Sequence, residues 1–443
     1  MRPLYIKQDF IVILISFINL LLAMLPGGLS FLSYIFLSLC LMFNYNLAPF
    51  IFLNLCFLVL GNETLFTGLE NYGVFKYLII FIFIMQSVTF FPKKIISNFY
   101  FFYFFLIFIV VTLHSVFFSV YPLFSFLKIF FWFLFVISFL VFFYRLHNDN
   151  KKKILKLCYS ILLIGVVASL FLNFIPSIGY FLNGTGLQGI YNQPQVFGSI
   201  SGIFGLISII LFFNSKNYLY LLFLLLSVIG VYLSQARTAA LALGLASAFL
   251  VFQILFDRFF RNTTKIYSRF SLRFLFILFT TLPWVIIWKL QEILNFINKR
   301  GEDGFSNISE SSRAVLIQPM FENIKNYGFT GIGFGIPSDL NFSDMIYLPI
   351  IYLPISLPIE KGVFYIATIE EMGFLFGIIV YLLLFIIFKK NILINWYSPI
   401  IVFIFAINLA ENTFFSIGGL GMLFWVFACM SLSFFSHQSK SDF

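Results

Sequence analysis

Long apolar runs separated by short polar breaks make up most of this sequence. Many of the runs hold about 20 residues, the length that a helix needs to cross the hydrocarbon core of a membrane. The chain of 443 residues is 61% hydrophobic and only 10% charged, and a soluble fold needs more polar surface than that. The alternation of apolar and polar residues that marks a transmembrane barrel strand is missing. We therefore expect an all-α polytopic membrane protein.

The polar breaks divide the apolar runs into about 12–14 predicted transmembrane helices. The number of helices is given as a range because the first three apolar runs are short and close together. The predicted spans are residues 10–26, 29–43, 47–61, 75–92, 97–119, 123–144, 154–175, 195–213, 217–234, 238–256, 272–289, 363–388, 392–411 and 414–436.

One long polar segment separates the predicted spans into two groups. Residues 1–289 are expected to form a transmembrane bundle (spans 1–11), residues 290–362 a large periplasmic loop, and residues 363–443 the last transmembrane helices with a short cytoplasmic tail. Apolar residues in the loop recur every three to four positions, which predicts an amphipathic helix with a kink or a late start at Pro319. Three prolines within residues 349–358 are too many for a regular helix, so this stretch is expected to be extended or to re-enter the membrane as a covering segment.

Lysines and arginines gather in alternate loops. With the N-terminus in the cytoplasm, every basic cluster of a short loop falls on the cytoplasmic side, including Lys151–Lys153 and residues 257–273. The positive-inside rule then places both termini in the cytoplasm and the long loop in the periplasm. Both clusters are interpreted as topology determinants with no further role. The net charge of +10 has the same explanation, so no nucleic-acid partner is expected.

Basic residues on the outer side need another explanation, because charges at a membrane edge tend to face a cavity or bind a ligand. Arg237 stands at the outer start of the Ala-rich run SQARTAALALGLASAFL. Its planar guanidinium fits phosphate oxygens through two parallel hydrogen bonds. Snorkelling to lipid headgroups or a local ion pair is the alternative interpretation. The other outer basic residues are Lys76, Lys128, Lys289, Lys299, Arg300, Arg313, Lys325 and Lys361.

The spacing of cysteine and histidine predicts neither a metal site nor a disulfide framework. The four cysteines lie singly within apolar runs, without a CxxC pair, and the three histidines are scattered. No metal and no cofactor are therefore expected.

Three pieces of the chain, in this order, resemble the O-antigen ligase/polymerase superfamily of bacterial membrane glycosyltransferases. The first is SQARTAALALGLASAFL, with an arginine at the outer start of a helix. The second is SSRAVLIQPMFENIKNYGFTGIGFG in the long loop, and the third is IEKGVFYIATIEEMGFLFGIIVYLLLF, where the loop re-enters the membrane. The resemblance covers roughly residues 185–435, and it rests on the order, spacing and topology of the motifs together.

This resemblance implies a substrate, an undecaprenyl-diphosphate-linked oligosaccharide that serves as donor and as acceptor at the periplasmic face of the bacterial inner membrane. Arg237 and Arg313 are the expected diphosphate ligands, and Lys361 and Lys289 are weaker candidates for the same role. Two guanidinium groups would stabilise the departing diphosphate without a metal. A chain-length regulator protein is a further partner that the resemblance implies, besides the lipid bilayer itself.

The reaction needs a base that takes the proton of the acceptor hydroxyl. The ligase branch of the superfamily has a histidine near the re-entry point, whereas this chain has Glu360 and Lys361 there. Glu360 is the expected base, with burial raising its pKa toward neutrality. The alternative is that Glu360 only pairs with a nearby cation. Other candidate bases are Glu370, Glu371, Glu411 and His114.

Three functions remain open from the sequence. The missing histidine favours a polymerase that transfers a glycan to the non-reducing end of another lipid-linked repeat unit. A ligase that transfers the finished glycan to lipid A-core or to a protein is the alternative within the superfamily. A carrier or flippase for polyprenyl-linked saccharides belongs to a different class, in which internal repeats and broken helices are typical; no repeat is visible in this sequence.

Overall fold

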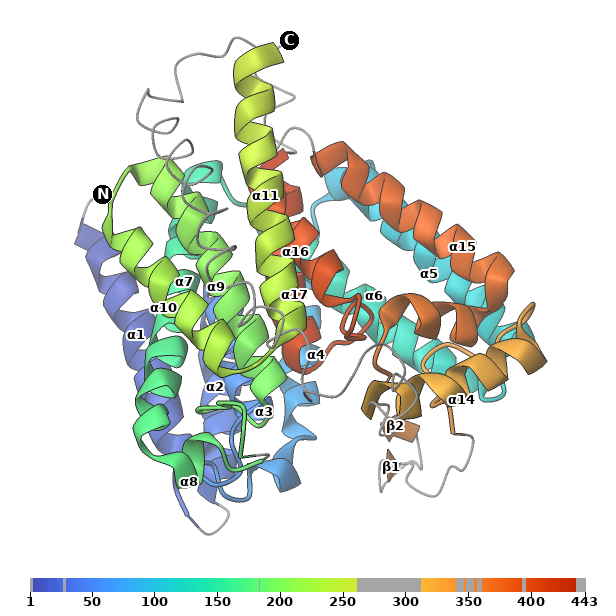
Figure 1. The fold of residues 1–443 in the computed structure, drawn as a ribbon. Coiled ribbons are helices and arrows are strands. Elements are labelled where there is room, and N and C mark those ends of the chain that lie inside the picture. Colours follow the sequence, from blue (N-terminus) through green and yellow to red (C-terminus); the bar gives the residue numbers. More distant parts are fainter. Residues whose placement is uncertain are drawn as a thin grey trace. The chain divides into compact units, whose positions relative to one another are not determined.

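In the residues that it describes, the computed structural model is mainly helical, with one short pair of strands (Figure 1). The chain forms two compact units, which are described separately below. The residues that the structure describes are 3–26, 29–182, 184–260, 312–339, 346–347, 354–356, 361–392 and 396–435.

Unit 1 consists of residues 1–161, 308–395 and 408–443. Its interior is aromatic: the ring of Phe52 packs edge-on against Phe83, Phe135 and Phe139 at centroid distances of 4.9–5.4 Å, an arrangement that suits aromatic quadrupoles. Its helices are α1 (Pro3–Ala23), α2 (Leu32–Phe43), α3 (Ala48–Val59), α4 (Phe75–Thr89), α5 (Phe99–Phe118), α6 (Pro122–Tyr144), the first part of α7 (Asn148–Phe171), α14 (Ser312–Tyr327), α15 (Phe364–Ile392) and α17 (Gly419–Phe435). Short 3-10 turns are η1 (Leu29–Phe31), η2 (Tyr45–Leu47), η3 (Leu69–Tyr72) and η4 (Lys93–Ile95).

Unit 2 consists of residues 162–307 and 396–407. Its central helix α9 is almost wholly buried and rich in glycine and serine, which lets neighbouring helices approach closely. Beside the end of α7, its elements are η5 (Leu172–Phe174), α8 (Pro176–Gly179), α9 (Pro194–Ser215), α10 (Leu219–Leu233), α11 (Arg237–Phe260) and α16 (Pro399–Ile407).

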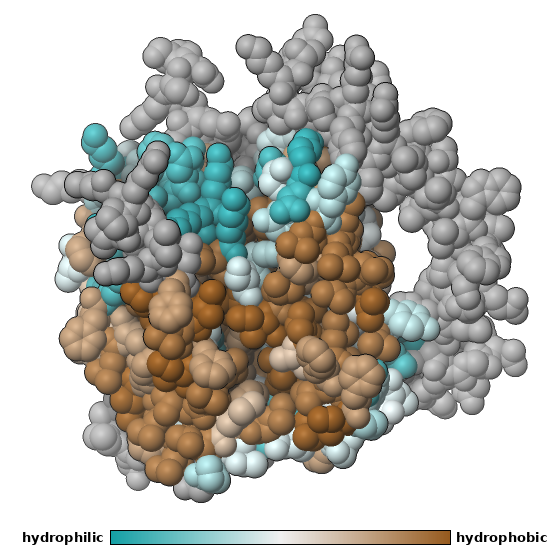
Figure 2. Space-filling view, turned by 90° about the vertical axis from the view of Figure 1, so that its left-hand side faces the viewer, coloured by the Kyte–Doolittle hydropathy of each residue, from teal (hydrophilic) through white to brown (hydrophobic). Residues whose placement is uncertain are grey.

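Six helices in the described residues are long and apolar enough to cross a membrane. Large apolar side chains also cover much of the outer surface, and the face in Figure 2 is mostly hydrophobic with its hydrophilic side chains gathered near one edge. The expectation of a helical membrane protein is confirmed at this level, whereas the number of spans and the side of the long loop stay predictions. The six helices are Phe99–Phe118, Pro122–Tyr144, Asn148–Phe174, Pro194–Ser215, Arg237–Leu255 and Phe364–Lys389.

Near the C-terminus the helices differ from the predicted spans. The span predicted for residues 392–411 contains only the nine-residue helix α16, and the helix predicted for 414–436 begins at Gly419. The predicted span 272–289 lies outside the described residues.

The proline-rich stretch contains an extended pair, as its sequence predicts. Strands β1 (Ile346–Tyr347) and β2 (Pro354–Ser356) pair antiparallel. In the preceding loop helix, Pro319 lies inside α14, which begins at Ser312.

The two compact units do not coincide with the three predicted regions of the chain. Unit 1 joins the first helices to both α14 and α15, although more than 140 residues of unit 2 separate them in the chain. The predicted boundary at residue 289 describes the order of spans along the chain and stays a prediction, because it concerns topology rather than packing.

Lys151 has a role beyond topology. Its side chain is fully buried, and its Nζ donates to the carbonyl oxygen of Ser433 at 2.8 Å and to Asn148 Oδ1 at 3.4 Å. Ser433 belongs to the last turn of α17, whose carbonyl groups lack intrahelical donors and attract cations. The interpretation of Lys151 as a topology determinant with no further role is therefore wrong. The neighbouring Lys152 is exposed.

The close contact between α9 and α10 can be tested at Gly205. A Cβ at this position would lie 2.1 Å from Ser227 Oγ, which is held by its bond to the Ser201 carbonyl at 2.6 Å. Gly205→Ala is expected to lower the free energy of unfolding by about 1–3 kcal/mol through overpacking. The matched control is Gly244→Ala in α11, where the added Cβ meets nothing within 4 Å. Thermal unfolding in detergent measures both, and equal midpoints would contradict the contact.

Candidate functional site

Three charged side chains meet in the interior of unit 1. Lys361 Nζ lies 2.8 Å from Glu370 Oε2 and 3.1 Å from Glu371 Oε1. Their side chains are 1%, 0% and 6% exposed, respectively. Buried charges are costly unless they are paired and hydrogen-bonded, and in membrane proteins they commonly mark functional sites. We call these three residues the ionic cluster.

A break in α15 shapes the backbone beside the ionic cluster. Gly373 has φ 69° and ψ 172°, which no helix accommodates, so the helix stops and restarts at this residue. The N–H of Phe374 then donates to the carbonyl of Gly328 at 2.8 Å instead of to the preceding helical turn. A Cβ at Gly373 would lie 2.2 Å from the Phe329 carbonyl oxygen, so only glycine fits the crossing of the two segments.

The break frees two carbonyl groups, and the Gly-rich turn of residues 331–335 satisfies them. The N–H of Ile332 donates to the Glu370 carbonyl at 3.0 Å, and the N–H of Gly333 donates to the Glu371 carbonyl at 2.9 Å. Because buried backbone groups need partners, the turn and the broken helix form one folding element.

Polar groups from the loop complete the shell around both carboxylates. Glu370 accepts hydrogen bonds from Asn323 Nδ2 at 2.7 Å and Ser338 Oγ at 3.1 Å. Glu371 Oε2 accepts one from the backbone N–H of Gly335 at 2.7 Å. These donors satisfy acceptor positions of both buried carboxylates.

Two more ionisable side chains border the Gly-rich turn. Lys128 of α6 donates to the Gly335 carbonyl at 3.4 Å, and its Nζ lies 5.7 Å from the centre of the Phe334 ring. His114 of α5 is buried, and its Nε2 contacts the Thr330 carbonyl at 2.5 Å. A carbonyl only accepts, so this nitrogen carries the proton. His114 therefore holds the turn through this nitrogen, and its role as a candidate base stays a prediction.

The charged groups of the ionic cluster are already paired with one another. Lys361 lies within ion-pair distance of both carboxylates, Glu370 accepts two hydrogen bonds and Glu371 accepts one. In this arrangement Lys361 already has two anionic partners, and a phosphate ligand would have to compete with them.

A second candidate site lies in unit 2, around Arg237. This arginine is the first residue of α11, directly after a turn in which Gln235 takes the left-handed conformation with φ 53°. The Gln235 side chain donates to the Thr185 carbonyl at 2.9 Å, and the N–H of Leu187 donates to the Leu233 carbonyl at 2.9 Å. The segment before α9 is thereby tied to the turn that carries Arg237.

No described residue compensates the charge of Arg237. Its side chain is half-buried, and within the described residues it has neither a hydrogen bond nor an acidic partner. The first N–H groups of α11 also lack intrahelical acceptors, and the helix dipole adds positive potential there. Together these groups form an environment that attracts an anion.

For the other predicted site residues, the structure describes less of the surroundings or none. Glu360 and Lys289 lie outside the described residues, and Arg313 is described only by its position as the second residue of α14. Glu411 lies between α16 and α17, where its carbonyl accepts from the N–H of Phe364 at 3.2 Å.

Sequence reasoning missed several members of the shell around the ionic cluster. Asn323 and Ser338 are ordinary polar residues of a polar segment, and no local pattern distinguishes them. The adjacent pair Glu370–Glu371 within an apolar run was the visible signal, and the buried Lys361 is the cation that it required.

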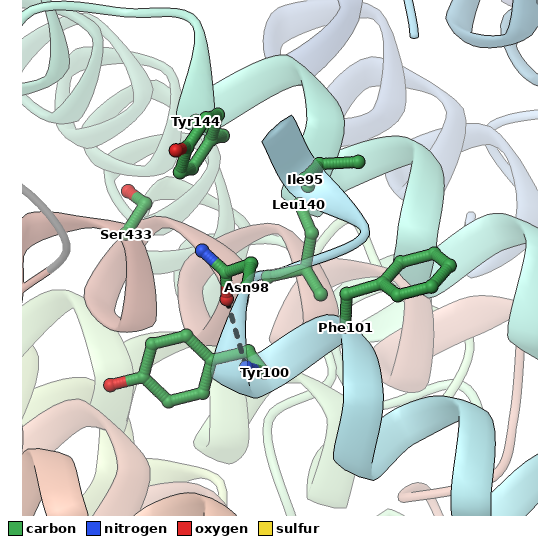
Figure 3. A pocket seen from close by; sticks show the side chains of 7 residues that line it. All are labelled: Ile95, Asn98, Tyr100, Phe101, Leu140, Tyr144 and Ser433. Atoms are coloured by element: carbon green, nitrogen blue, oxygen red, sulfur yellow. Dashed lines mark hydrogen bonds between the residues drawn. The ribbon is translucent and has the colours of Figure 1, made fainter. Parts of the chain in front are cut away.

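A small pocket elsewhere in unit 1 is no substrate site (Figure 3). Its volume is about 10 Å³, which is room for roughly one water molecule. The side chains that line it are Ile95, Asn98, Tyr100, Phe101, Leu140, Tyr144 and Ser433.

No family model matches this sequence, and no curated protein matches it significantly. Membership of the O-antigen ligase/polymerase superfamily therefore rests on the motif resemblance alone and stays a prediction.

The ionic cluster makes a stability prediction. Lys361→Met removes the cation and leaves two buried carboxylates facing each other, which is expected to lower the free energy of unfolding by about 3–5 kcal/mol. Adding Glu370→Gln and Glu371→Gln to this variant should recover part of the loss. Lys325→Met, at an exposed position of α14, is the control. Unfolding in detergent measures all three, and a Lys361→Met protein as stable as the control would contradict the pairing.

Proposed function

We propose that the protein is a membrane glycosyltransferase of the polymerase type. It would transfer a growing glycan from undecaprenyl diphosphate to the non-reducing end of another lipid-linked repeat unit at the periplasmic face of the bacterial inner membrane. Three observations support the proposal: the membrane-spanning helices, the ordered motif resemblance, and the chemistry around Arg237.

The observation that carries the proposal is the uncompensated charge of Arg237. It lies at the first turn of an apolar helix of span length, and no described side chain neutralises it. A lipid diphosphate combines an apolar tail with an anionic head, so it matches a cation at the end of such a helix. Arginine binds phosphate oxygens in pairs, and a partly dry setting strengthens the attraction.

In the proposed reaction, the acceptor hydroxyl oxygen attacks the anomeric carbon of the donor. The bond between that carbon and the diphosphate oxygen breaks, and its electron pair stays on the departing lipid diphosphate. Arg237 and Arg313 would stabilise this negative charge, and the hydroxyl proton would pass to the carboxylate of Glu360.

Arg237→Ala is expected to lower the rate of polymer formation about 10²–10³-fold, since one donor to the departing oxyanion is lost. Arg237→Lys should also be slow, because an ammonium lacks the two-pronged geometry. Purified protein in detergent with a lipid-linked repeat unit provides the assay, read as a glycan ladder. Arg145→Ala, at an exposed arginine after α6, is the control and should keep the full ladder. A wild-type ladder from Arg237→Ala would refute the diphosphate site.

Glu360→Gln is expected to stop turnover while binding of the lipid donor persists, because the amide keeps the shape of the carboxylate but is not a base. The measurement pairs the ladder assay with retention of the lipid donor on the purified protein. Full activity of Glu360→Gln would leave this residue with an ion-pairing role alone.

A carrier of polyprenyl-linked saccharides is the second candidate, and one observation favours it. Transporters commonly have broken membrane helices with charged groups at the break, and α15 breaks at Gly373 beside the ionic cluster. The detergent assay separates the two functions, since a carrier forms no new glycosidic bond and makes no ladder.

A further inference from the structure

The Gly-rich turn of residues 331–335 already binds an anion, which is a carboxylate of the protein itself. The backbone N–H of Gly335 donates to Glu371 Oε2 at 2.7 Å, and Lys361 Nζ lies 3.1 Å from Glu371 Oε1. Each oxygen of one carboxylate thus has its own partner, a backbone N–H for Oε2 and an ammonium group for Oε1. This is the way in which proteins bind free oxyanions, with backbone N–H groups of a turn supplemented by a cation.

The same turn also binds a second ammonium group. Lys128 Nζ donates to the Gly335 carbonyl at 3.4 Å, and Gly335 is the residue whose N–H holds Glu371. Gly335 has φ +71°, a backbone conformation that favours glycine. A Cβ there would also lie 2.5 Å from Lys128 Nζ, so the lysine would have to move.

Glu371 differs from Glu370 in its surroundings. The side chain of Glu370 is 0% exposed and pairs with Lys361. It also accepts hydrogen bonds from two side chains, Asn323 and Ser338. The side chain of Glu371 is 6% exposed and is held by one backbone N–H and Lys361. Glu371 is thus the more accessible and the more replaceable of the two anions.

We propose that Gly335, Lys361 and Lys128 form an oxyanion-binding site, in which the Glu371 carboxylate is the occupant in this structure and which takes a carboxylate or phosphate ligand when that side chain is removed from it. Without Glu371, the charges of Lys361 and Lys128 are balanced only by the carboxylate of Glu370, so these three side chains carry one net positive charge. An added monoanion restores the balance.

The site would give the proposed polymerase a second contact with its substrate. The identity of its physiological ligand rests on the proposed function, whereas the site itself does not. A lipid diphosphate supplies the phosphate oxyanions that such a site recognises, and Lys361 would then contact the diphosphate after exchange with Glu371. The binding site itself exists whether or not the protein is a polymerase.

Chemical rescue tests the site on the full-length protein in detergent. Glu371→Ala leaves a cavity and an uncompensated cation, and is expected to lower the thermal midpoint by on the order of 10 °C. Sodium acetate, as the carboxylate probe, should restore at least half of that loss, relative to sodium chloride at the same ionic strength. Sodium pyrophosphate, as the phosphate probe, should also restore it if the site accepts a diphosphate head.

Three comparisons make the rescue specific. Glu371→Gln fills the cavity, so neither probe should raise its midpoint more than it raises that of the wild type. Glu371→Ala combined with Lys128→Met should lose most of the rescue. Glu322→Ala, at an exposed position of α14, should neither lose stability nor respond to the probes.

Equal responses of Glu371→Ala and Glu371→Gln to both probes would overturn the site, as would the absence of any rescue of Glu371→Ala. Rescue by acetate alone would support the oxyanion site but exclude a diphosphate as its ligand. The readout is independent of the polymerase proposal: Arg237→Ala with a complete glycan ladder refutes that proposal, and the rescue of Glu371→Ala would still stand.

Discussion

Every backbone N–H and C=O group of a chain in hydrocarbon must find a partner inside the protein, because no water is there to supply one. This constraint explains why helices dominate the described residues. It also explains how, in the described part of the chain, the span-length helix α15 can stop and restart. At Gly373 the freed groups do not remain unpaired: Phe374 donates to Gly328, while the carbonyls of Glu370 and Glu371 accept from Ile332 and Gly333. The break exists because a second segment completes its hydrogen bonds.

The same crossing brings charge into the interior. Once the Gly-rich turn lies against the break, the side chains of Glu370 and Glu371 have backbone and side-chain donors within reach, and Lys361 supplies the positive charge that both require. Removing Lys361 leaves two buried carboxylates without their cation, and that penalty exceeds the modest gain of a single pair. The cluster is therefore best understood as one interdependent set of contacts between the loop, α14 and α15.

Arg237 presents the opposite electrostatic situation. Glu370 and Glu371 are paired with Lys361, whereas no described residue gives the guanidinium of Arg237 an acidic partner. A cation at the end of an apolar helix is suited to a ligand that carries both negative charge and an apolar tail. This contrast is the reason for proposing Arg237, rather than the ionic cluster, as the residue that binds the substrate.

The sequence by itself determined the class of the protein and the places worth testing. Apolar runs of span length specify helices, since a single segment satisfies its own backbone in lipid only as a helix. Arg237 and the pair Glu370–Glu371 are conspicuous because charge is rare in such runs. Only the tertiary structure decided what these charges face. The contacts of Lys361, Asn323 and Ser338 with one carboxylate join residues that lie up to 47 positions apart, and the burial of Lys151 depends on Ser433, 282 positions away. Local pattern cannot encode such pairings, because they arise when helices that are distant in the chain pack and exclude water from between them.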